Sequence, residues 1–352
     1  MPLLTYYNVG IAGISAVVPR KVVKNLDCEG PFTRQEIEKT ISITGIEERR
    51  VADKNVTTSD LCFEAANMLL DEMAIDRKSI DFLFLVTQTP DYRQPTTSTI
   101  LQHRLGLSKS TGAFDINLAC SGYVYGLSTA FSYASLNGIN RILLLVGETN
   151  SKAVSPRDRA TSLLFGDGGT ATLIEKDEKY GRSYFSLNSD GSGEDILKIS
   201  GGGYRNPSSQ ETLMERKYED GSIRSDEHLS MDGVEVFKFT MGEIPKDLKR
   251  VLKFAQMNLD EIDHIVFHQA NKFITDHFVR KLKYATEKVP YSLKRFGNTG
   301  SASIPLTVVS EMKDSFVGQT KQVLFSGFGG GLSWGTSALR LCDCYVSNLG
   351  KL

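Results

Sequence analysis

Apolar residues along this chain gather in short runs that alternate with longer segments of mixed polarity. The runs 9–19, 80–89 and 141–148 are apolar almost throughout, which predicts strands buried on both faces of a sheet. The segment 59–73 instead repeats its apolar residues at helical spacing. Strands that alternate with helix-length segments are typical of an α/β fold in which crossover helices join the strands.

The same alternation continues to the end of the chain and predicts two similar α/β halves. A proline at position 245 lies within one long helical pattern, where it predicts a break. Further strands are expected at 112–119, 165–176, 263–269, 322–329 and 332–344, and further helices at 96–105, 121–137, 234–257, 272–284 and 301–313.

The composition changes between the two halves. Residues 189–230 are rich in Gly, Ser, Asp and Asn, which predicts loops and a small hairpin. We therefore expect an N-terminal half over 1–180, an irregular insertion over 181–232 and a C-terminal half over 233–352. The insertion is expected to be a solvated excursion, and a cover over a substrate entrance is the alternative.

Charge and cysteine content exclude several classes of protein. The 352 residues carry 41 basic and 42 acidic side chains, so no overall field attracts nucleic acid. Five dispersed cysteines do not form a disulfide framework and indicate a reducing compartment. The apolar runs are too short to span a bilayer, and the N-terminus lacks signal-peptide features. We expect a cytoplasmic protein without nucleic-acid or membrane partners.

One cysteine lies where a predicted strand gives way to a predicted helix. In INLACSGYVYGL (116–127), Cys120 follows the apolar strand and precedes a helix of small and aromatic residues. The free N–H groups at a helix N-terminus favour a thiolate, which is the nucleophilic form of cysteine. The alternative is a core thiol, because free cysteine is among the most buried residue types.

Two histidines, His264 and His268, lie four residues apart in a β-like segment. Residues at this spacing in a strand are about 13 Å apart, too far to bind one metal ion. No metal site is therefore expected. His268 instead ends its strand, as Cys120 does, and open α/β sheets bind ligands at strand ends. A structural histidine is the alternative.

Two glycine-rich segments complete the candidate chemistry. In GNTGSASIP (297–305), Asn298 serves as a turn residue or offers an amide donor from a fixed loop. The segment GFGGGLSWG (327–335) lacks the residue order of a phosphate-binding loop. Its glycines predict close approach of the backbone to a ligand, with an amide near Gly330 available to an oxyanion.

Taken in order, these motifs resemble the 3-oxoacyl-carrier-protein synthase III family of the thiolase superfamily. The resemblance rests on Cys120, on HQAN at 268–271 and on the segments 165–173, 297–305 and 327–335, and it extends over nearly the whole chain. It implies a five-layered α-β-α-β-α fold built from two similar halves, normally in a homodimer.

The resemblance also implies a reaction. Cys120 takes an acyl group from a thioester while a backbone amide near Gly330 holds the oxyanion. A malonyl thioester, expected to be malonyl-carrier-protein, then loses CO2. His268 and Asn298 donate hydrogen bonds to the resulting enolate, which attacks the acyl-cysteine to give a 3-oxoacyl product. No metal, flavin or nucleotide cofactor is required.

The residues that bind coenzyme A in this family are only partly retained. A Trp and an Arg upstream of a TGI motif clamp the adenine of coenzyme A in the family's priming enzymes, and here Lys39 and Ile43 stand there. Ile43 can neither stack as a cation nor pair with phosphate. Arg159 matches a basic residue of the cofactor channel, and Phe328 is a candidate for shaping the acyl site. We therefore expect an acyl-carrier-protein donor in a specialised fatty-acid or polyketide-type pathway.

Two other reactions of the superfamily are alternatives. Some relatives transfer the acyl group from cysteine to an alcohol or an amine, although these often lose the Asn or alter the His that this chain retains. The hydroxymethylglutaryl-CoA synthase branch needs a glutamate as general base. Gln88 occupies that segment here and cannot accept a proton, which argues against this second reaction.

Overall fold

The computed structural model describes residues 2–28 and 30–352 and contains two large sheets. The first sheet has the order β17-β2-β8-β7-β5-β6, and β18 also pairs with β2. Its strands β7, β5 and β6 run parallel, whereas β8 is antiparallel to both of its neighbours. The bounds are β2 Val9–Val18, β5 Phe82–Val86, β6 Gly112–Ile116, β7 Arg141–Glu148, β8 Gly168–Lys176, β17 Tyr345–Val346 and β18 Gly350–Lys351.

The second sheet has the order β1-β9-β16-β15-β14. Its β14 and β15 are parallel, and β16 is antiparallel to both β15 and β9. The series β14-β15-β16-β9 therefore repeats the directions of β5-β7-β8-β2, which confirms the expected pair of similar halves. The bounds are β1 Leu3–Tyr7, β9 Arg182–Ser189, β14 His264–Phe267, β15 Thr320–Gly329 and β16 Ser333–Cys342.

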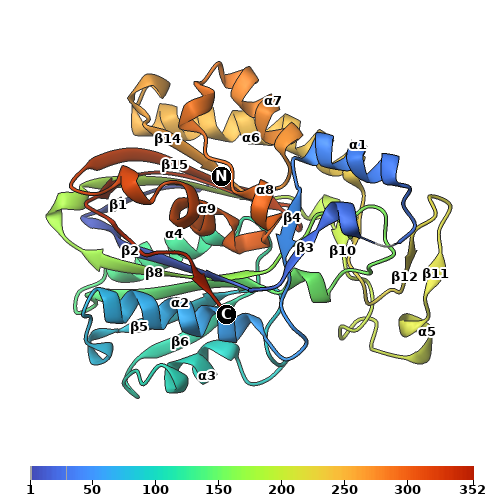
Figure 1. The fold of residues 1–352 in the computed structure, drawn as a ribbon. Coiled ribbons are helices and arrows are strands. Elements are labelled where there is room, and N and C mark those ends of the chain that lie inside the picture. Colours follow the sequence, from blue (N-terminus) through green and yellow to red (C-terminus); the bar gives the residue numbers. More distant parts are fainter. Residues whose placement is uncertain (1, 29) are drawn as a thin grey trace.

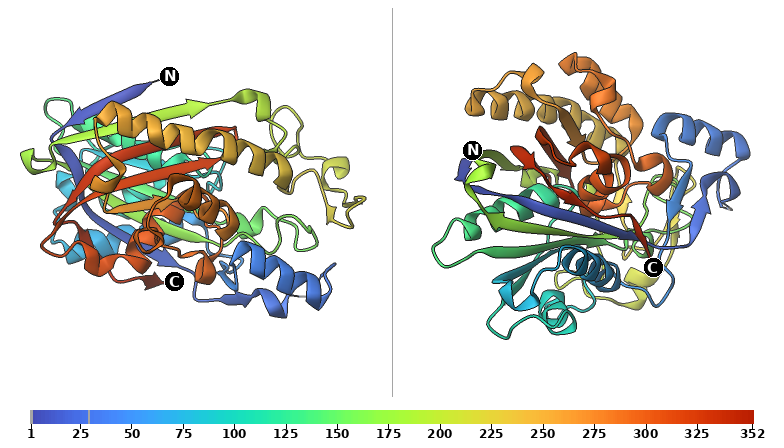
Figure 2. Two further views of the ribbon diagram at one scale, coloured as in Figure 1. Left: turned by 90° about the horizontal axis from the view of Figure 1, so that it is seen from above. Right: turned by 60° about the vertical axis from the view of Figure 1, so that its left-hand side comes forward.

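Helices alternate with the two sheets to give the five expected layers (Figure 1). One pair covers the outer face of the first sheet, a second pair lies between the sheets, and a third covers the outer face of the second sheet (Figure 2). In that order the pairs are α2 (Thr58–Glu72) with α3 (Thr97–Arg104), α4 (Gly122–Ala134) with α9 (Ser303–Glu311), and α6 (Gly233–Ala255) with α7 (Lys272–Leu282).

The predicted start of the irregular insertion, at residue 181, is several residues too early in the chain. Within the predicted range 181–232, β9 is an internal strand of the second sheet, hydrogen-bonded to β1 and β16. The irregular part starts after Ser189 and extends to one side of the layers (Figure 1). Its short elements are β10 (Leu197–Lys198), α5 (Gln210–Leu213), β11 (Arg216–Lys217), β12 (Ile223–Arg224) and β13 (Ser230–Met231).

The helix expected to break near Pro245 is continuous through that residue. A proline removes one helical hydrogen bond and leaves the carbonyl four residues earlier without its donor. In α6 this is the Met241 carbonyl, which instead accepts a hydrogen bond from the Lys281 ammonium at 3.1 Å. A contact from α7 thus satisfies the carbonyl that the proline leaves without a donor.

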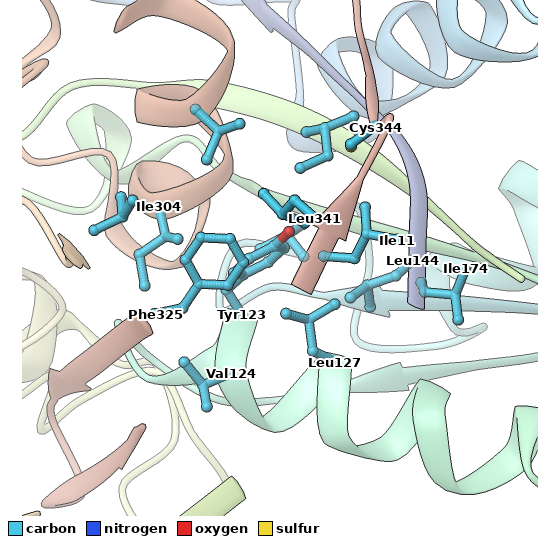
Figure 3. Close-up of a cluster of buried hydrophobic side chains, with 14 of the residues drawn as sticks. Ile11, Tyr123, Val124, Leu127, Leu144, Ile174, Ile304, Phe325, Leu341 and Cys344 are labelled. Atoms are coloured by element: carbon cyan, nitrogen blue, oxygen red, sulfur yellow. The ribbon is translucent and has the colours of Figure 1, made fainter. Parts of the chain in front are cut away.

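The largest core cluster fills the space between the two sheets (Figure 3). Tyr123, Val124 and Leu127 project from α4 toward residues of both sheets, among them Leu144 and Phe325. Burial of so many apolar side chains on both faces of α4 fixes the position of its N-terminus, where Cys120 lies.

Smaller elements lie beside the layers, and their bounds are α1 Arg34–Thr44, β3 Val22–Lys24, β4 Glu48–Arg50 and α8 Leu293–Phe296. The helix α1 begins with a capping box, in which Thr33 and Glu36 satisfy each other's backbone N–H groups. Among the described residues, no helix is both long and apolar enough to cross a membrane.

Candidate active site

Cys120 lies in the turn between β6 and α4, directly before the N-cap residue Ser121. Two glycines of β15 admit this turn. A Cβ on Gly329 would lie 2.8 Å from Cys120 Cβ, and a Cβ on Gly327 would lie 3.0 Å from the Cys120 carbonyl oxygen. Larger residues at either position would displace the cysteine. The close approach expected for this glycine motif is therefore an approach to the cysteine itself.

A short chain of hydroxyl groups fixes the Gly330 turn against the start of α4. The Ser121 and Ser333 hydroxyls are 2.7 Å apart, and Ser333 Oγ donates to the Gly330 carbonyl at 3.0 Å. Because the Ser333 hydroxyl proton is used in the bond to Gly330, the Ser121 hydroxyl donates its proton to Ser333 Oγ. Because all three residues are tied together, the backbone at Gly330 has a defined place beside Cys120.

The Cys120 thiol is 7% exposed and is neutral at rest. Burial and, to a smaller extent, the nearby Glu148 carboxylate raise its pKa to about 12. The expected preference for thiolate at a helix N-terminus is outweighed, because desolvation disfavours the charged form. Attack on a thioester therefore requires the thiol proton to leave as the new carbon–sulfur bond forms.

His268 follows β14 directly and is almost completely buried. Its Nδ1 lies 2.7 Å from Ser303 Oγ, which also accepts the Gln269 backbone N–H at 3.3 Å. The Ser303 hydroxyl proton is thus free to donate to Nδ1, and this favours the tautomer with its proton on Nε2. Burial lowers the pKa of His268 to about 3, against an opposing contribution from the Gly300 backbone, so the imidazole is neutral.

Asn298 is held in a turn that fixes the orientation of its amide. Its backbone N–H donates to the Leu164 carbonyl at 2.8 Å, and its carbonyl accepts the Gly166 N–H at 3.0 Å. The side-chain Oδ1 accepts the Gly300 N–H at 2.9 Å. Because Oδ1 is occupied, the Nδ2 group is the part of the amide available to donate to a ligand.

One cavity of about 330 Å³, called the first cavity below, brings these three side chains together. Cys120, His268 and Asn298 all line it, together with the Gly330 backbone. Phe328 also lines it and packs edge-on against the His268 ring at 5.4 Å between ring centroids. The rest of the wall is mainly apolar and includes Leu197, Met231, Phe237, Phe239 and Phe273. The irregular segment after Ser189 therefore helps to build the cavity and is not only a solvated excursion.

A second cavity, of about 480 Å³, also opens onto Cys120 and Gly330. It lacks His268 and Asn298, and it shares Phe165 and Leu197 with the first cavity. Polar side chains are more numerous here, and they include Gln88, Thr89, Asn117, Asn150, Glu194 and Lys198.

A buried carboxylate, Glu148, supports the site and was not singled out from the sequence. It ends β7 and accepts hydrogen bonds from the Gln88 N–H, the Thr89 hydroxyl and the Ser301 hydroxyl at 3.0 to 3.2 Å. These contacts join the ends of β5 and β7 to the turn that carries Asn298. The only signal in the sequence was an acidic residue at the end of an apolar strand.

Glu148 predicts a specific pH dependence of stability. Burial raises its pKa to about 7, against hydrogen bonds from Gln88 and Ser301 that lower it. Because the pKa of Glu148 is higher in the folded than in the unfolded state, this side chain stabilises the fold at pH values below its unfolded-state pKa. This contribution is lost as pH rises through 7. We expect it to amount to up to about 3 kcal/mol in the free energy of unfolding. Glu148→Gln should flatten this dependence in denaturant melts between pH 4.5 and 8, and identical slopes in both proteins would contradict it.

Arg159 lines neither cavity. Its guanidinium pairs with Glu36 of α1 at 2.5 Å and lies over the Phe32 ring, 5.2 Å from the centroid. Hydrogen bonds from Thr33 and then from Arg159 hold the pKa of Glu36 at about 2, so this partner is a carboxylate. The structure thus places Arg159 against α1, the helix that also carries Lys39 and Ile43, and in neither of the two cavities that reach Cys120.

The other positions of the expected coenzyme A binding site lie on the same helix, α1. Glu36, Lys39 and Ile43 follow at spacings of three and four, which places them along one side of α1. Ile43 is 47% exposed. The sole tryptophan, Trp334, is buried in β16 against Phe239 and does not line the first cavity.

No group of three His, Cys, Asp or Glu side chains in residues 2–28 and 30–352 is arranged to hold a metal ion. His264 is the first residue of β14, and His268 directly follows the last residue of this strand. The site is built from thiol, imidazole and amide groups in a mainly apolar cavity. Such a set can transfer an acyl group and stabilise an oxyanion.

Comparison with known proteins gives consistent matches over both halves of the chain. The family model of 3-oxoacyl-[acyl-carrier-protein] synthase III matches residues 114–191, and the model of the C-terminal part of the same synthase matches residues 252–341. The beta-ketoacyl-[acyl-carrier-protein] synthase III of Desulfitobacterium hafniense is 34% identical over 95% of this chain and 98% of that protein.

Solved structures resemble the whole fold. A 3-oxoacyl-(acyl-carrier protein) synthase from Burkholderia xenovorans has a TM-score of 0.93 and 36% identity, with 100% of this chain and 99% of that chain covered. The priming beta-ketosynthase of the R1128 polyketide pathway has a TM-score of 0.82 and 27% identity, over 96% and 97% of the two chains.

Proposed function

The chain belongs to the 3-oxoacyl-[acyl-carrier-protein] synthase III family of acyl-transferring condensing enzymes, and from this premise we propose that Cys120, His268 and Asn298 are its catalytic residues. The observation that carries the proposal is that a thiol, an imidazole and an oriented amide donor line the same apolar cavity. The proposed reaction is a decarboxylative condensation of an acyl thioester with a malonyl thioester.

The first step transfers the acyl group to the enzyme. Cys120 Sγ attacks the thioester carbonyl, a carbon–sulfur bond forms, and the bond to the donor's sulfur breaks. The thiol proton of Cys120 ends on the departing sulfur, so the step is balanced without a co-reactant. The fixed backbone at Gly330 provides an N–H for the tetrahedral oxyanion, supported by the Ser121–Ser333 contact.

The second step forms the new carbon–carbon bond. The malonyl group loses CO2, and its electron pair remains as an enolate whose oxygen accepts hydrogen bonds from His268 Nε2 and Asn298 Nδ2. The enolate carbon attacks the acyl-cysteine, the Cys120 carbon–sulfur bond breaks, and the resulting thiolate takes one proton from solvent water. A neutral imidazole suits this role, because it donates one hydrogen bond while the apolar wall excludes water.

Stoichiometry tests this reaction. Protein preloaded with an acyl group is mixed with a malonyl thioester that carries a 13C label in its free carboxyl group. We expect one labelled CO2 and one 3-oxoacyl thioester for each acyl group lost from the protein. Release of the acyl group without CO2 would contradict the condensation.

Transfer to an alcohol or an amine is the second candidate reaction. The complete set of Cys120, His268 and Asn298 in one cavity favours condensation, because simple acyl transfer has no enolate for two donors to stabilise. An acyl-enzyme that persists with malonyl thioester but clears with an alcohol or amine would favour transfer instead.

An acyl-carrier protein is the proposed acyl donor, in a specialised fatty-acid or polyketide-type pathway. The expected clamp for the adenine of coenzyme A has no cation at position 43, and Arg159 is already paired with the Glu36 carboxylate. A carboxylate beside the remaining guanidinium also disfavours an anionic phosphate.

We expect an acyl-carrier protein to load Cys120 at least about tenfold faster than the matching acyl-CoA, since losing charge-assisted contacts costs about 1.5–3 kcal/mol. Intact mass spectrometry of the protein over time measures both rates. The double variant Lys39→Trp with Ile43→Arg should raise the rate with acyl-CoA and leave the carrier-protein rate unchanged. Efficient loading of the unaltered protein from acyl-CoA would contradict the prediction.

We also propose that two copies associate through the edge of the first sheet. Within the described part of the chain, β6 pairs only with β5, and its residues, among them Phe114 and Ile116, are half-buried. An unpaired edge strand offers free N–H and C=O groups to a second copy. This agrees with the homodimer that the family resemblance implies.

A further inference from the structure

Cys120 opens onto two cavities whose walls differ in chemistry. The first cavity holds His268 and Asn298 and is otherwise mainly apolar. The second cavity contains neither of these catalytic side chains. Its lining instead includes three carboxamide side chains, those of Gln88, Asn117 and Asn150.

The order of the proposed reaction assigns a role to each cavity. The acyl group stays on Cys120 while the malonyl thioester enters, so the acyl chain needs space that the second thioester does not use. The malonyl carbonyl has to reach His268 and Asn298, and it therefore occupies the first cavity. The second cavity remains for the acyl chain. This assignment rests on the proposed function.

The carboxamides of the second cavity include hydrogen-bond donors and acceptors that have no partner among the described residues. Gln88 Nε2 and Asn117 Oδ1 are 3.4 Å apart, a long contact that leaves Gln88 Oε1 and Asn117 Nδ2 unused. Asn150 is half-buried, and no described residue hydrogen-bonds to its side-chain amide. It lies against Gly300, where a Cβ would be 2.7 Å from Nδ2.

The one cation of this wall, Lys198, is already paired with carboxylates. Its ammonium lies 2.7 Å from Asp195 and 3.8 Å from Glu194, all within the irregular segment. The wall therefore presents no unpaired cation to an anionic ligand, and its other polar groups, the three carboxamides and the Thr89 hydroxyl, are neutral. Leu118, Phe165 and Leu229 provide apolar contact for a carbon chain in the same cavity.

We propose that the acyl group held on Cys120 is neutral and carries an oxygen on its chain, as a hydroxyacyl or oxoacyl group does, and that Asn150 recognises this oxygen. A carboxamide both donates and accepts, so it suits either a hydroxyl or a keto oxygen. A plain hydrocarbon chain would instead remove water from the three carboxamides without replacing its hydrogen bonds, which lowers affinity.

Two matched donors test this specificity. Butanoyl and 3-hydroxybutanoyl thioesters of the same carrier differ by one hydroxyl group, and intact mass spectrometry gives the rate at which each acylates Cys120. We expect the hydroxylated donor to react about tenfold faster with the unaltered protein. Asn150→Leu should reverse this preference, and Asn117→Leu, at an exposed position, should reduce it.

Asn140→Leu is the matched control, because Asn140 is exposed just before β7 and lines neither cavity. It should keep the ratio of the unaltered protein. A faster reaction of the butanoyl donor with that protein, or an unchanged ratio in both Asn150→Leu and Asn117→Leu, overturns the inference. Absence of any acyl adduct from either donor overturns the proposed function as well, so the two failures are distinguishable.

Discussion

The variant Cys120→Ala is expected to form no acyl adduct, and its rate of 3-oxoacyl formation should fall at least about 1,000-fold. Of the described residues that line both cavities, Cys120 alone has a side chain that can form a covalent bond to an acyl group. Without it, the enolate has no acyl-enzyme to attack. Intact mass spectrometry and product assays measure the two effects.

The same variant separates two parts of the reaction. His268 and Asn298 remain in place, so decarboxylation of the malonyl thioester should continue and release CO2 without a condensation product. The matched control is Cys342→Ala, since Cys342 is buried to a similar degree and lies in β16 away from both cavities. An acyl adduct of normal yield on Cys120→Ala would show that another residue is the nucleophile.

Replacing the enolate donors should have the opposite pattern. In His268→Ala and Asn298→Asp we expect normal acylation of Cys120, whereas condensation falls about 100- to 1,000-fold, the usual cost of one oxyanion donor. Asn298→Asp keeps the oxygen that accepts the Gly300 N–H and replaces only the free Nδ2 donor by an acceptor. It therefore tests the hydrogen bond without removing the turn.

Single-turnover mixing of acyl-loaded protein with malonyl thioester measures this effect. Thermal melts of each variant serve as the control for folding. Equal loss of acylation and condensation in both variants would contradict the assignment, because it would indicate general damage to the cavity.

The sequence was informative where the chemistry is local. Cys120, His268 and Asn298 each follow a short pattern that is legible in a few residues, and the ends of apolar strands predicted where the first two lie. The alternation of strands and helices predicted the five layers, because burial on both faces leaves continuous apolar runs.

Features that depend on distant contacts could not be predicted in this way. The strand β9 alternates polar and apolar residues beside a loop-rich segment, and its place in the sheet follows from pairing with β1 and β16. The α6 helix continues through Pro245, and the carbonyl that the proline leaves free accepts a hydrogen bond from Lys281 of another helix. The raised pKa of Cys120 likewise reflects burial by the fold.

The pairing of Arg159 is a further case of this kind. A motif places this arginine in the expected cofactor channel, and the structure shows that its guanidinium is already paired with Glu36, 123 positions away in the sequence. A partner this distant leaves no local pattern. The carboxylate at Glu148 was missed for the same reason, since its donors come from two segments far from it in the sequence, Gln88–Thr89 and Ser301.

The most direct test of the central claim is the intact mass of the unaltered protein, recorded first with an acyl-carrier protein alone and then after addition of malonyl-carrier-protein. The account predicts one acyl group per chain, mapped to Cys120, which then disappears as a 3-oxoacyl product forms. An adduct on another residue, or an acyl-Cys120 that persists after the malonyl donor is added, would contradict it.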